Sequence, residues 1–303
     1  MIERLIEWAG ARNITVQLEP STGFCARVRL VDGRNHMVIG ADLGLNSSSA
    51  RRVADDKAFA RYFLELDGLA TVDTRVIGPG DPVRFDGLLP VVVKPNRGYG
   101  GDGVLAVTDA RWLATAVEYA RRFDDRVLVQ PRIEAPEFRL IVLDGACIGV
   151  YERLGLVLEG DGQSTVRRLL GVQAPALSAR LYAGEDSPIA YSLRCRNMTL
   201  NDVPKRGALI QPIVAANLKQ GANHRDRSDV HPRYKRLAVD ATRALGLVVS
   251  GVDLFASDIT SPDGMAAIIE VNANPGFEYL QHVPASLDRL VRRACGEDRA
   301  DVG

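Results

Sequence analysis

The stretch that decides the fold is Ile268-Ile269-Glu270-Val271-Asn272-Ala273-Asn274-Pro275-Gly276-Phe277, which follows Gly251-Val252-Asp253-Leu254-Phe255 along the chain. Oxygen-bearing and apolar side chains alternate in both segments, a pattern typical of strands with one buried face. Such a pleat buries the valines and isoleucines and turns Asp253, Glu270 and Asn272 to the opposite face. Mg²⁺ prefers oxygen ligands and is commonly held by one or two carboxylates together with nucleotide phosphates. The two segments therefore predict a hard-cation site, although the acids of a solvated edge strand would give the same pattern.

The whole chain has the composition of a globular protein. Its 303 residues are 46% hydrophobic, which is enough for a sizeable core and for two or three subdomains. The 38 basic and 38 acidic residues give a formal net charge of +0 and form no block of like charge, so we expect neither nucleic acid nor a membrane as a partner. Four scattered cysteines, without a Cys-x-x-Cys pair, argue against a zinc site or a disulfide framework. We expect no signal peptide and no transmembrane segment. Together with the scattered cysteines, this predicts a cytoplasmic protein with reduced thiols.

The first third predicts a small α/β lobe. We expect a helix over residues 2–11, a strand over 15–19 and a hairpin formed by 26–31 and 37–39. A longer helix follows from N-cap candidates at Ser47 to Ser49 and ends near Leu66. Lys57 lies in the middle of that expected helix, where a solvated lysine is the simplest interpretation. The turn-rich segment Gly78-Pro79-Gly80-Asp81-Pro82 marks a boundary.

A glycine-rich flap follows this boundary. A strand over residues 89–93 ends in Lys94-Pro95, and a second run over 104–107 comes after Asn96-Arg97-Gly98-Tyr99-Gly100-Gly101-Asp102-Gly103. Glycines let backbone N–H groups approach phosphate oxygens closely. The segment lacks the Gly-Lys-Ser/Thr ending of a P-loop, and it leads into a strand where a dinucleotide-binding motif would lead into a helix. A hairpin that closes over a triphosphate fits, as does an ordinary loop.

The rest of the chain continues the α/β pattern. We expect a helix over residues 110–122, a strand over 126–131, and a hairpin of 137–143 and 146–151 that turns at Asp144-Gly145. Ser164 is the expected N-cap of a helix over 166–170, and residues 171–203 are expected to be irregular and to lie on the surface. His231-Pro232 begins a helix that ends at Leu245, and a helix over 286–293 is the last expected element.

The chain carries an ordered set of landmarks that resembles the ATP-grasp carboxylate–amine ligases. The likeness extends over residues 50–282 and is strongest to the ATP-grasp parts of cyanophycin synthetase and of bifunctional glutathione synthetase. The landmarks are Lys57, Lys94-Pro95 with the loop to Gly103, Val129-Gln130 with Glu137-Phe138-Arg139, Gly160-Asp161-Gly162-Gln163-Ser164-Thr165, Ala216-Asn217-Leu218, Asp226-Arg227-Ser228-Asp229-Val230-His231-Pro232, Gly251-Val252-Asp253 and Glu270 to Gly276.

The resemblance implies an α/β (α+β) ATP-grasp fold in which the nucleotide is held between two α+β subdomains. It implies a small N-terminal α/β lobe (residues 1–78), a central subdomain with the glycine-rich flap (79–135) and a C-terminal subdomain with the metal site (136–303). A homodimer or homotetramer is also implied.

The same resemblance assigns roles to individual residues. The implied ATP-binding set comprises phosphate ligands, flap glycines and groups on the adenine and ribose: Lys57, Lys94, Gly98, Gly100, Gly101, Gly103, Gln130, Pro131, Ile133 and Glu137. Asp253, Glu270 and Asn272 would hold Mg²⁺ or Mn²⁺. Arg139 and Arg153 would bind the transferred phosphoryl group and the substrate carboxylate, since planar guanidinium groups bind both in two-point fashion. Salt bridges at strand ends are the simpler interpretation of both arginines.

The implied reaction joins the carboxylate of an amino acid or small peptide to an amine. ATP phosphorylates the carboxylate, and the amine then displaces phosphate. Relatives place an arginine two or four residues before the asparagine matched by Asn217, whereas this chain has Ala215 and Ile213 there. Lys219 or Arg225 would replace that cation, unless the substrate is bound differently. A small-molecule kinase and a regulatory nucleotide-binding protein remain as alternatives.

Overall fold

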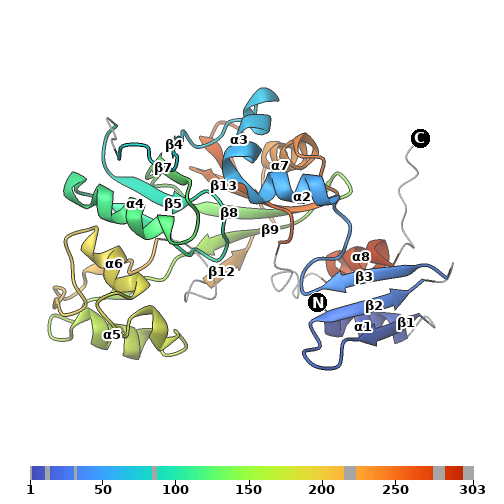
Figure 1. Ribbon diagram of the computed structural model, residues 1–303, viewed down its shortest axis with the longest axis horizontal. Coiled ribbons are helices and arrows are strands. Elements are labelled where there is room, and N and C mark those ends of the chain that lie inside the picture. The colour runs from blue at the N-terminus through green and yellow to red at the C-terminus, as the bar shows by residue number, and fades with distance from the viewer. Residues whose placement is uncertain are drawn as a thin grey trace.

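The computed structural model describes residues 2–10, 14–30, 33–83, 87–214, 223–275 and 284–295. Its helices, two of them short 3-10 turns labelled η, are α1 (Ile2–Gly10), α2 (Ser48–Asp55), α3 (Lys57–Leu66), η1 (Ala110–Trp112), α4 (Leu113–Arg121), α5 (Val166–Gln173), η2 (Ala179–Leu181), α6 (Pro188–Arg194), α7 (Pro232–Ala244) and α8 (Pro284–Ala294). Its strands are β1 (Thr15–Leu18), β2 (Cys25–Arg29), β3 (Asn35–Ile39), β4 (Arg75–Ile77), β5 (Val91–Pro95), β6 (Leu105–Val107), β7 (Val127–Pro131), β8 (Glu137–Leu143), β9 (Ala146–Leu154), β10 (Leu158–Glu159), β11 (Leu209–Ile210), β12 (Asn223–Asp226), β13 (Val249–Ala256) and β14 (Ala266–Asn272). This mixed architecture confirms the predicted α/β class (Figure 1).

The largest sheet has the strand order β12-β9-β8-β13-β14, with the neighbouring strands antiparallel. Helices α2, α3 and α7 pack on one of its faces (Figure 1), where Phe138, Leu140 and Leu254 belong to a buried apolar cluster. Each fully buried side chain of this kind stabilises the fold by about 1.5–3 kcal/mol. Because side chains alternate along a strand, residues 137 and 139 of β8 face the opposite side of the sheet.

A β-bulge in β14 modifies the simple alternation predicted from the sequence. Asp253 pairs with Glu270, but the next residue of β13 pairs with Ile268, so Ile269 is an extra residue in the ladder. The bulge allows Ile268 and Val271 to belong to the same buried cluster. It leaves Glu270 on the other face, together with Asp253. The predicted burial is confirmed for Ile268 and Val271 and is wrong for Ile269, which does not belong to this buried cluster.

The N-terminal lobe covers the other face of the large sheet at one end. The expected helix and hairpin are confirmed as α1 and as β2 paired with β3, whereas Asp32 at the expected turn lies outside the described residues. The lobe shares a buried cluster with Ile141, Leu143 and Val249 of the sheet and with α8. Figure 1 shows α8 beside this lobe, at one end of an elongated molecule. The remainder of that face, around residues 137 and 139, is left uncovered by the lobe.

A second, four-stranded antiparallel sheet has the order β4-β7-β5-β6. The predicted flap is confirmed as the antiparallel pair of β5 and β6, in which Val91 lies opposite Val107. Helix α4 and Tyr191 of α6 complete the buried cluster of this sheet. Strand β4 precedes the expected boundary at residue 78 and pairs with β7 beyond it. The division of the chain at residues 78 and 135 stays a prediction.

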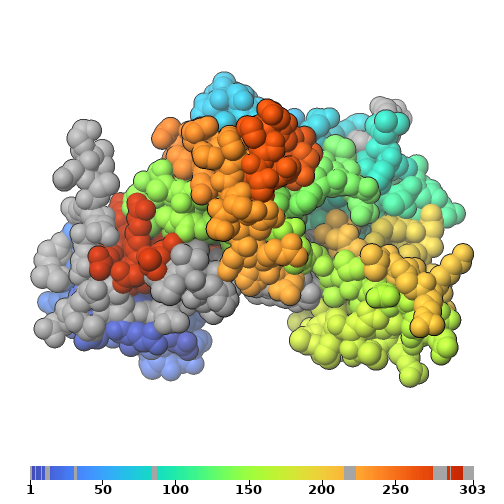
Figure 2. Space-filling model, turned by 180° about the vertical axis from the view of Figure 1, so that it is seen from behind, coloured from blue at the N-terminus to red at the C-terminus, as the bar shows by residue number. Residues whose placement is uncertain are grey.

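The prediction that residues 171–203 are irregular is wrong in part, because they contain the end of α5 as well as η2 and α6. Helix α6 is short but almost entirely buried from Ile189 to Leu193, so its sequence lacks the amphipathic alternation that marks a surface helix. It packs with α5 around a separate apolar cluster. In Figure 2 this α5–α6 unit and the N-terminal lobe form two separate protrusions on the body of the molecule.

Two predicted helix starts are also corrected. Thr165, not Ser164, is the N-cap of α5, because its hydroxyl accepts from Arg168 N at 3.3 Å. The long helix expected up to Leu66 is broken at Asp56, which has an extended backbone and caps α3 by accepting from Phe59 N at 3.2 Å. Asp56 is fully buried and forms ion pairs with Arg97 and Arg126. Lys57 therefore begins α3.

Candidate nucleotide and metal site

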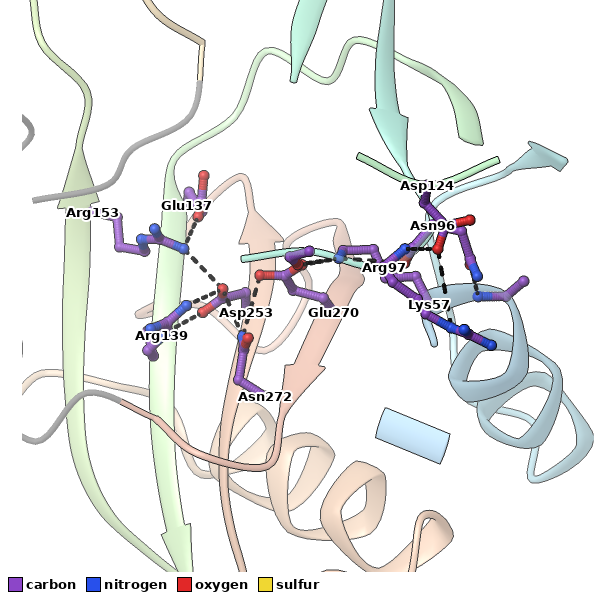
Figure 3. Close-up of polar contacts among 12 residues, drawn as sticks. Lys57, Asn96, Arg97, Asp124, Glu137, Arg139, Arg153, Asp253, Glu270 and Asn272 are labelled. Atoms are coloured by element: carbon purple, nitrogen blue, oxygen red, sulfur yellow. Dashed lines mark hydrogen bonds and ion pairs between the residues drawn. The ribbon is translucent and has the colours of Figure 1, made fainter. Parts of the chain in front are cut away.

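The uncovered face of the large sheet brings five charged side chains together. Asp253 lies opposite Arg139 of β8 and opposite Glu270 of β14. Glu137, two residues before Arg139, lies opposite Arg153 of β9. Directly opposed side chains on one face of a sheet are near neighbours, with Cβ atoms about 4.5–5.5 Å apart. The sheet register therefore assembles the predicted metal ligands and the predicted arginines in one place (Figure 3).

Asp253 is held by two guanidinium groups. Arg139 donates from Nε to Oδ1 and from Nη2 to Oδ2, at 2.5 Å each. Arg153 donates from Nη1 to Oδ2 at 2.8 Å, and the same nitrogen lies 2.7 Å from Glu137 Oε1. Asp253 is fully buried, and an unpaired charge there would be costly. Burial opposes the charge of Arg139, but Asp253 outweighs it and raises the pKa of this guanidinium well above its ordinary value.

Asn272 bridges the two carboxylates of the predicted metal site. Its Nδ2 donates to Asp253 Oδ2 at 3.3 Å and to Glu270 Oε1 at 3.2 Å. On the far side of Glu270, Lys57 Nζ lies 3.7 Å from Oε2. Burial by itself raises the pKa of Glu270, but Lys57, Lys94 and the nearby arginines together hold it well below its usual range. Glu270 is therefore ionised at neutral pH.

The four-stranded sheet contributes Lys94 from β5 and Gln130 from β7. Burial lowers the pKa of Lys94 to about 8, although Glu270 acts in the opposite direction. Gln130 is also buried, and its Nε2 donates to Thr74 Oγ1 at 2.7 Å. Lys57, at the start of α3, donates to Gly98 O in the glycine-rich loop at 2.9 Å. Two lysines thus face the carboxylates from the opposite side.

A cleft of about 840 Å³ lies between these groups, within the usual range for ligand sites. The predicted residues that line it are Lys57, Lys94, Gly98, Gly100, Gly101, Gln130, Pro131, Ile133, Glu137, Arg139, Arg153, Asp253, Glu270 and Asn272. Gly103 is the exception among the flap glycines. A Cβ on it would meet Phe123 at 2.7 Å, and its φ is +74°, so close packing and a left-handed turn account for this glycine.

The region expected to stabilise the ligation step is only partly described. Asn217, Lys219 and Ala215 lie outside the described residues. Ile213 is buried in the apolar cluster of the α5–α6 unit. Arg225, the other cation considered as a substitute, lies 3.6 Å from Glu152 and has a largely exposed side chain.

Several residues of the cleft were not predicted. Ile269, Arg132 and Asn274 line it, and the bulge that turns Ile269 toward it is a feature that alternation alone does not reveal. Ala41, from the N-terminal part of the chain, lines it as well. No group of three or more His, Cys, Asp or Glu side chains suited to a metal occurs among the described residues. The candidate metal set consists of two carboxylates and an amide.

Two families match separate parts of this chain. The family described as "RimK-like ATP-grasp domain" matches residues 214–288, and "D-ala D-ala ligase C-terminus" matches residues 83–155. The second match contains β5, β7 and the flap, and the first contains β13 and β14 with Asp253 and Glu270. Residues 214–288 and 83–155 are thus similar to ATP-grasp ligase domains, which agrees with the resemblance seen in the sequence.

Curated relatives agree with this assignment. A cyanophycin synthetase from Nostoc sp. is 30% identical over 253 residues, which cover 77% of this chain and 27% of that protein. The glutathione biosynthesis bifunctional protein GshAB from Mannheimia succiniciproducens is 32% identical over 205 residues, which cover 61% of this chain and 27% of that protein. The chain thus spans only about a quarter of the length of these relatives.

Solved structures share the fold. A bifunctional glutathione synthetase from Pasteurella multocida has a TM-score of 0.57 at 20% identity, covering 96% of this chain and 44% of that one. A D-alanine–D-alanine ligase from Bacillus anthracis has a TM-score of 0.53 at 17% identity, covering 83% of this chain and 69% of that one. Within the described part of this chain, no helix is long and apolar enough to cross a membrane.

Proposed function

We propose that this protein is an ATP- and Mg²⁺-dependent ligase that joins a small carboxylate to an amine and releases ADP and phosphate. The observation that carries the proposal is the cleft in which Lys57 and Lys94 face Asp253, Glu270 and Asn272. Cations on one wall suit the phosphates of a nucleotide, and oxygen ligands on the other suit the metal that accompanies them. The curated relatives that share this domain are a cyanophycin synthetase and GshAB, and their names motivate amino acids and peptides as substrates.

The donor chemistry fits Mg²⁺ or Mn²⁺. Glu270 stays ionised although its side chain is only 24% exposed, and Asp253 offers two carboxylate oxygens beside it. The amide of Asn272 lies between both carboxylates, and its Oδ1 would be the ligand atom. Oxygen-rich sets of this kind are typical for hard divalent ions. When bound, the metal would shield the negative charge of the β- and γ-phosphates. The proposed ligands are Asp253, Glu270 and Asn272.

The residues of this chain would bind the nucleotide from several sides. Lys57 and Lys94 would neutralise phosphate oxygens beneath the loop that contains Gly98, Gly100 and Gly101. Gln130, with the main chain at Pro131 and Ile133, would hold the adenine, and Glu137 would accept from the ribose hydroxyls. Ile269, which lines the same cleft, would add an apolar surface for the base.

Arg139 and Arg153 would change partners when the site fills. In the structure both arginines neutralise Asp253, which is the carboxylate proposed for the metal. A divalent ion at Asp253 would compete with these ion pairs and free one or both guanidinium groups to bind the phosphoryl group and the carboxylate that accepts it. Asn217 and Lys219 are proposed to stabilise the subsequent attack by the amine.

The proposal is tested by measuring release of ADP and phosphate with a panel of amino acids and short peptides, offered singly and in pairs, with mass spectrometry of the products. We expect Mg²⁺-dependent release that requires two compounds, with a product one water lighter than their sum. A single compound that gains a stable phosphoryl group would identify a kinase instead. ATP binding without turnover on the whole panel would favour a regulatory nucleotide-binding protein.

A further inference from the structure

The connection from the N-terminal lobe to α2 makes an unusual set of contacts through Asn46. Asn46 Nδ2 donates to Val249 O and to Ala273 O, at 2.8 Å each. Its Oδ1 accepts from Val248 N at 2.7 Å and from Val249 N at 3.1 Å. An amide side chain offers two donors and two acceptor positions, so this one uses its full capacity. All four bonds join backbone groups at the start of β13 and directly after β14.

These bonds lie where the β13–β14 ladder stops. The last backbone pair of the ladder is Gly251 with Asn272, and the two strands separate beyond it. Pro275 then crosses close to Gly251, so close that a Cβ on this glycine would lie 2.8 Å from Pro275 Cβ. The Asn46 side chain replaces the missing backbone bonds by holding Val249 and Ala273 together. These four hydrogen bonds of Asn46, called the Asn46 clamp below, reach Ala273, one residue after the proposed metal ligand Asn272.

A second contact, from Arg51 in α2, holds the residue that follows Ala273. Arg51 forms an ion pair with Asp42. With the Asn274 amide oriented so that both of its ends are satisfied, its oxygen accepts from Arg51 Nη2 at 3.2 Å and its nitrogen donates to Ala273 O at 3.0 Å. Asn274 and Ala41 both line the cleft. The connection therefore fixes the edge of the cleft next to the proposed metal ligands.

We propose that Asn46 is a positioning residue for the metal site, acting through the segment from Asn272 to Asn274. This inference rests on the proposed function, because it takes Asp253, Glu270 and Asn272 as the metal ligands. Residues that orient metal ligands without binding the metal themselves typically contribute about 10- to 100-fold to metal affinity, which is lost when they are replaced. Without the clamp the chain after Asn272 is free to move away from β13, and the amide of Asn272 is no longer held against Asp253.

The test uses Mn²⁺ as a probe, measured by its electron paramagnetic resonance in the presence of ADP, together with the free energy of unfolding. We expect Asn46→Ala to weaken Mn²⁺ binding about 10-fold while the affinity for ADP without metal is retained. Asn46→Ser, which leaves a shorter group able to donate and accept, should weaken it less and provides a milder variant if the alanine variant does not fold.

Tyr234→Phe is the matched control. It removes one partly buried hydrogen bond, from Tyr234 Oη to Asp258 O at 2.7 Å, beyond the other end of the β13 strand. We expect it to lower stability and to leave Mn²⁺ affinity unchanged. If the folded Asn46 variants lose stability but keep the affinity of the wild type for Mn²⁺, Asn46 is only structural and the inference is overturned.

Glu270→Ala separates this failure from failure of the proposed function, because Glu270 is a proposed metal ligand with a partly exposed side chain. Strong Mn²⁺ binding by the wild type that Glu270→Ala abolishes, together with no effect of the Asn46 variants, overturns the positioning role alone. Mn²⁺ binding that is insensitive to Glu270→Ala overturns both the metal site and the inference that depends on it.

Discussion

Asp253 shows how one buried residue organises the site. Its carboxylate is inaccessible to solvent and lies within hydrogen-bond distance of Arg139, Arg153 and Asn272. Breaking a buried pair by removing one partner typically costs about 3–5 kcal/mol, because the other charge is left uncompensated. Glu270 is less enclosed, with a side chain that is 24% exposed. The two proposed metal ligands therefore differ in how much the fold depends on them.

This difference makes Glu270→Ala the better probe of the metal site. We expect it to abolish Mg²⁺-dependent release of ADP while the protein stays folded, because it removes a metal ligand from a partly open position. Turnover and thermal unfolding should be measured together, with Glu65→Ala on the exposed side of α3 as a control. Turnover equal to that of the wild type would show that Glu270 is not a metal ligand.

The lowered pKa of Lys94 leads us to expect that nucleotide binding depends on pH. Burial lowers its pKa to about 8, so the empty site loses the proton of Lys94 as the pH rises through this value. Phosphate oxygens favour the protonated form, and nucleotide affinity should therefore fall above about pH 8. Lys94→Met should bind more weakly at pH 7 and lose this dependence, as titrations of Mg·ADP binding would show. A pH profile shared by both proteins would place the titration in another group.

The same shift has a consequence for stability. The pKa of Lys94 is lower in the folded protein than in the unfolded chain, so the unfolded state binds more protons between about pH 8 and pH 10.5. The contribution of Lys94 to the free energy of unfolding therefore increases as the pH rises through this range. Chemical denaturation of the wild type and of Lys94→Met over this range checks the sign. A contribution that falls with rising pH would contradict the burial argument.

At the scale of elements, the motif Gly160-Asp161-Gly162-Gln163-Ser164-Thr165 has a structural explanation. Asp161 Oδ1 accepts from Gln163 N and Ser164 N, at 2.8 and 2.6 Å, and Thr165 then caps α5. A Cβ on Gly160 would lie 2.4 Å from Lys205 O. The motif turns the chain into α5 and permits a close backbone contact, and within the structure it lies outside the lining of the cleft.

Gly160→Ala should therefore destabilise the protein, by about 1–3 kcal/mol as expected for overpacking against an unyielding neighbour. Gly171→Ala is the matched control, because Gly171 lies within α5 and a Cβ there meets nothing within 4 Å. We expect the control to stabilise the protein by up to about 1 kcal/mol, since alanine favours the helix. Urea denaturation measures both, and equal effects would contradict the contact with Lys205.

The elements also show what the sequence can and cannot predict. Strands and hairpins with β-branched runs and an Asp-Gly turn were predicted well, because pleat and turn chemistry are local. The break between α2 and α3 was missed, since Asp56 depends on Arg97 and Arg126, which are distant in sequence. Helix α6 was missed because it is buried on nearly all sides. The bulge at Ile269 depends on packing against the neighbouring strands.

In the candidate site, too, features that depend on contacts between distant residues were missed. The carboxylates, lysines and arginines of the cleft were predicted because their types and order resemble a known family. Asn46 was missed because its four bonds reach residues about 200 positions away, and the sequence near it contains no motif. The pairing of Arg139 with Asp253 was also missed, since it depends on the register between β8 and β13.

At the scale of the whole molecule, the cleft depends on three separate parts of the chain. The large sheet contributes the carboxylates, the four-stranded sheet contributes Lys94 and Gln130, and α3 contributes Lys57. The parallel bridge between Thr71 and Ile268 joins the segment after α3 to β14. Such an arrangement would let the two sheets enclose the proposed nucleotide and exclude water.

In the proposed reaction ATP activates the carboxylate as an acyl phosphate. The most direct measurement uses the substrate pair from the panel, with both oxygens of the carboxylate labelled with ¹⁸O. One labelled oxygen bonds to the γ-phosphorus when ADP leaves, and the amine then displaces that oxygen together with the phosphate.

We expect one ¹⁸O in the released inorganic phosphate and one in the amide product, both observed by mass spectrometry. Phosphate without ¹⁸O would show that water or another acceptor received the phosphoryl group, and would contradict ligation through an acyl phosphate.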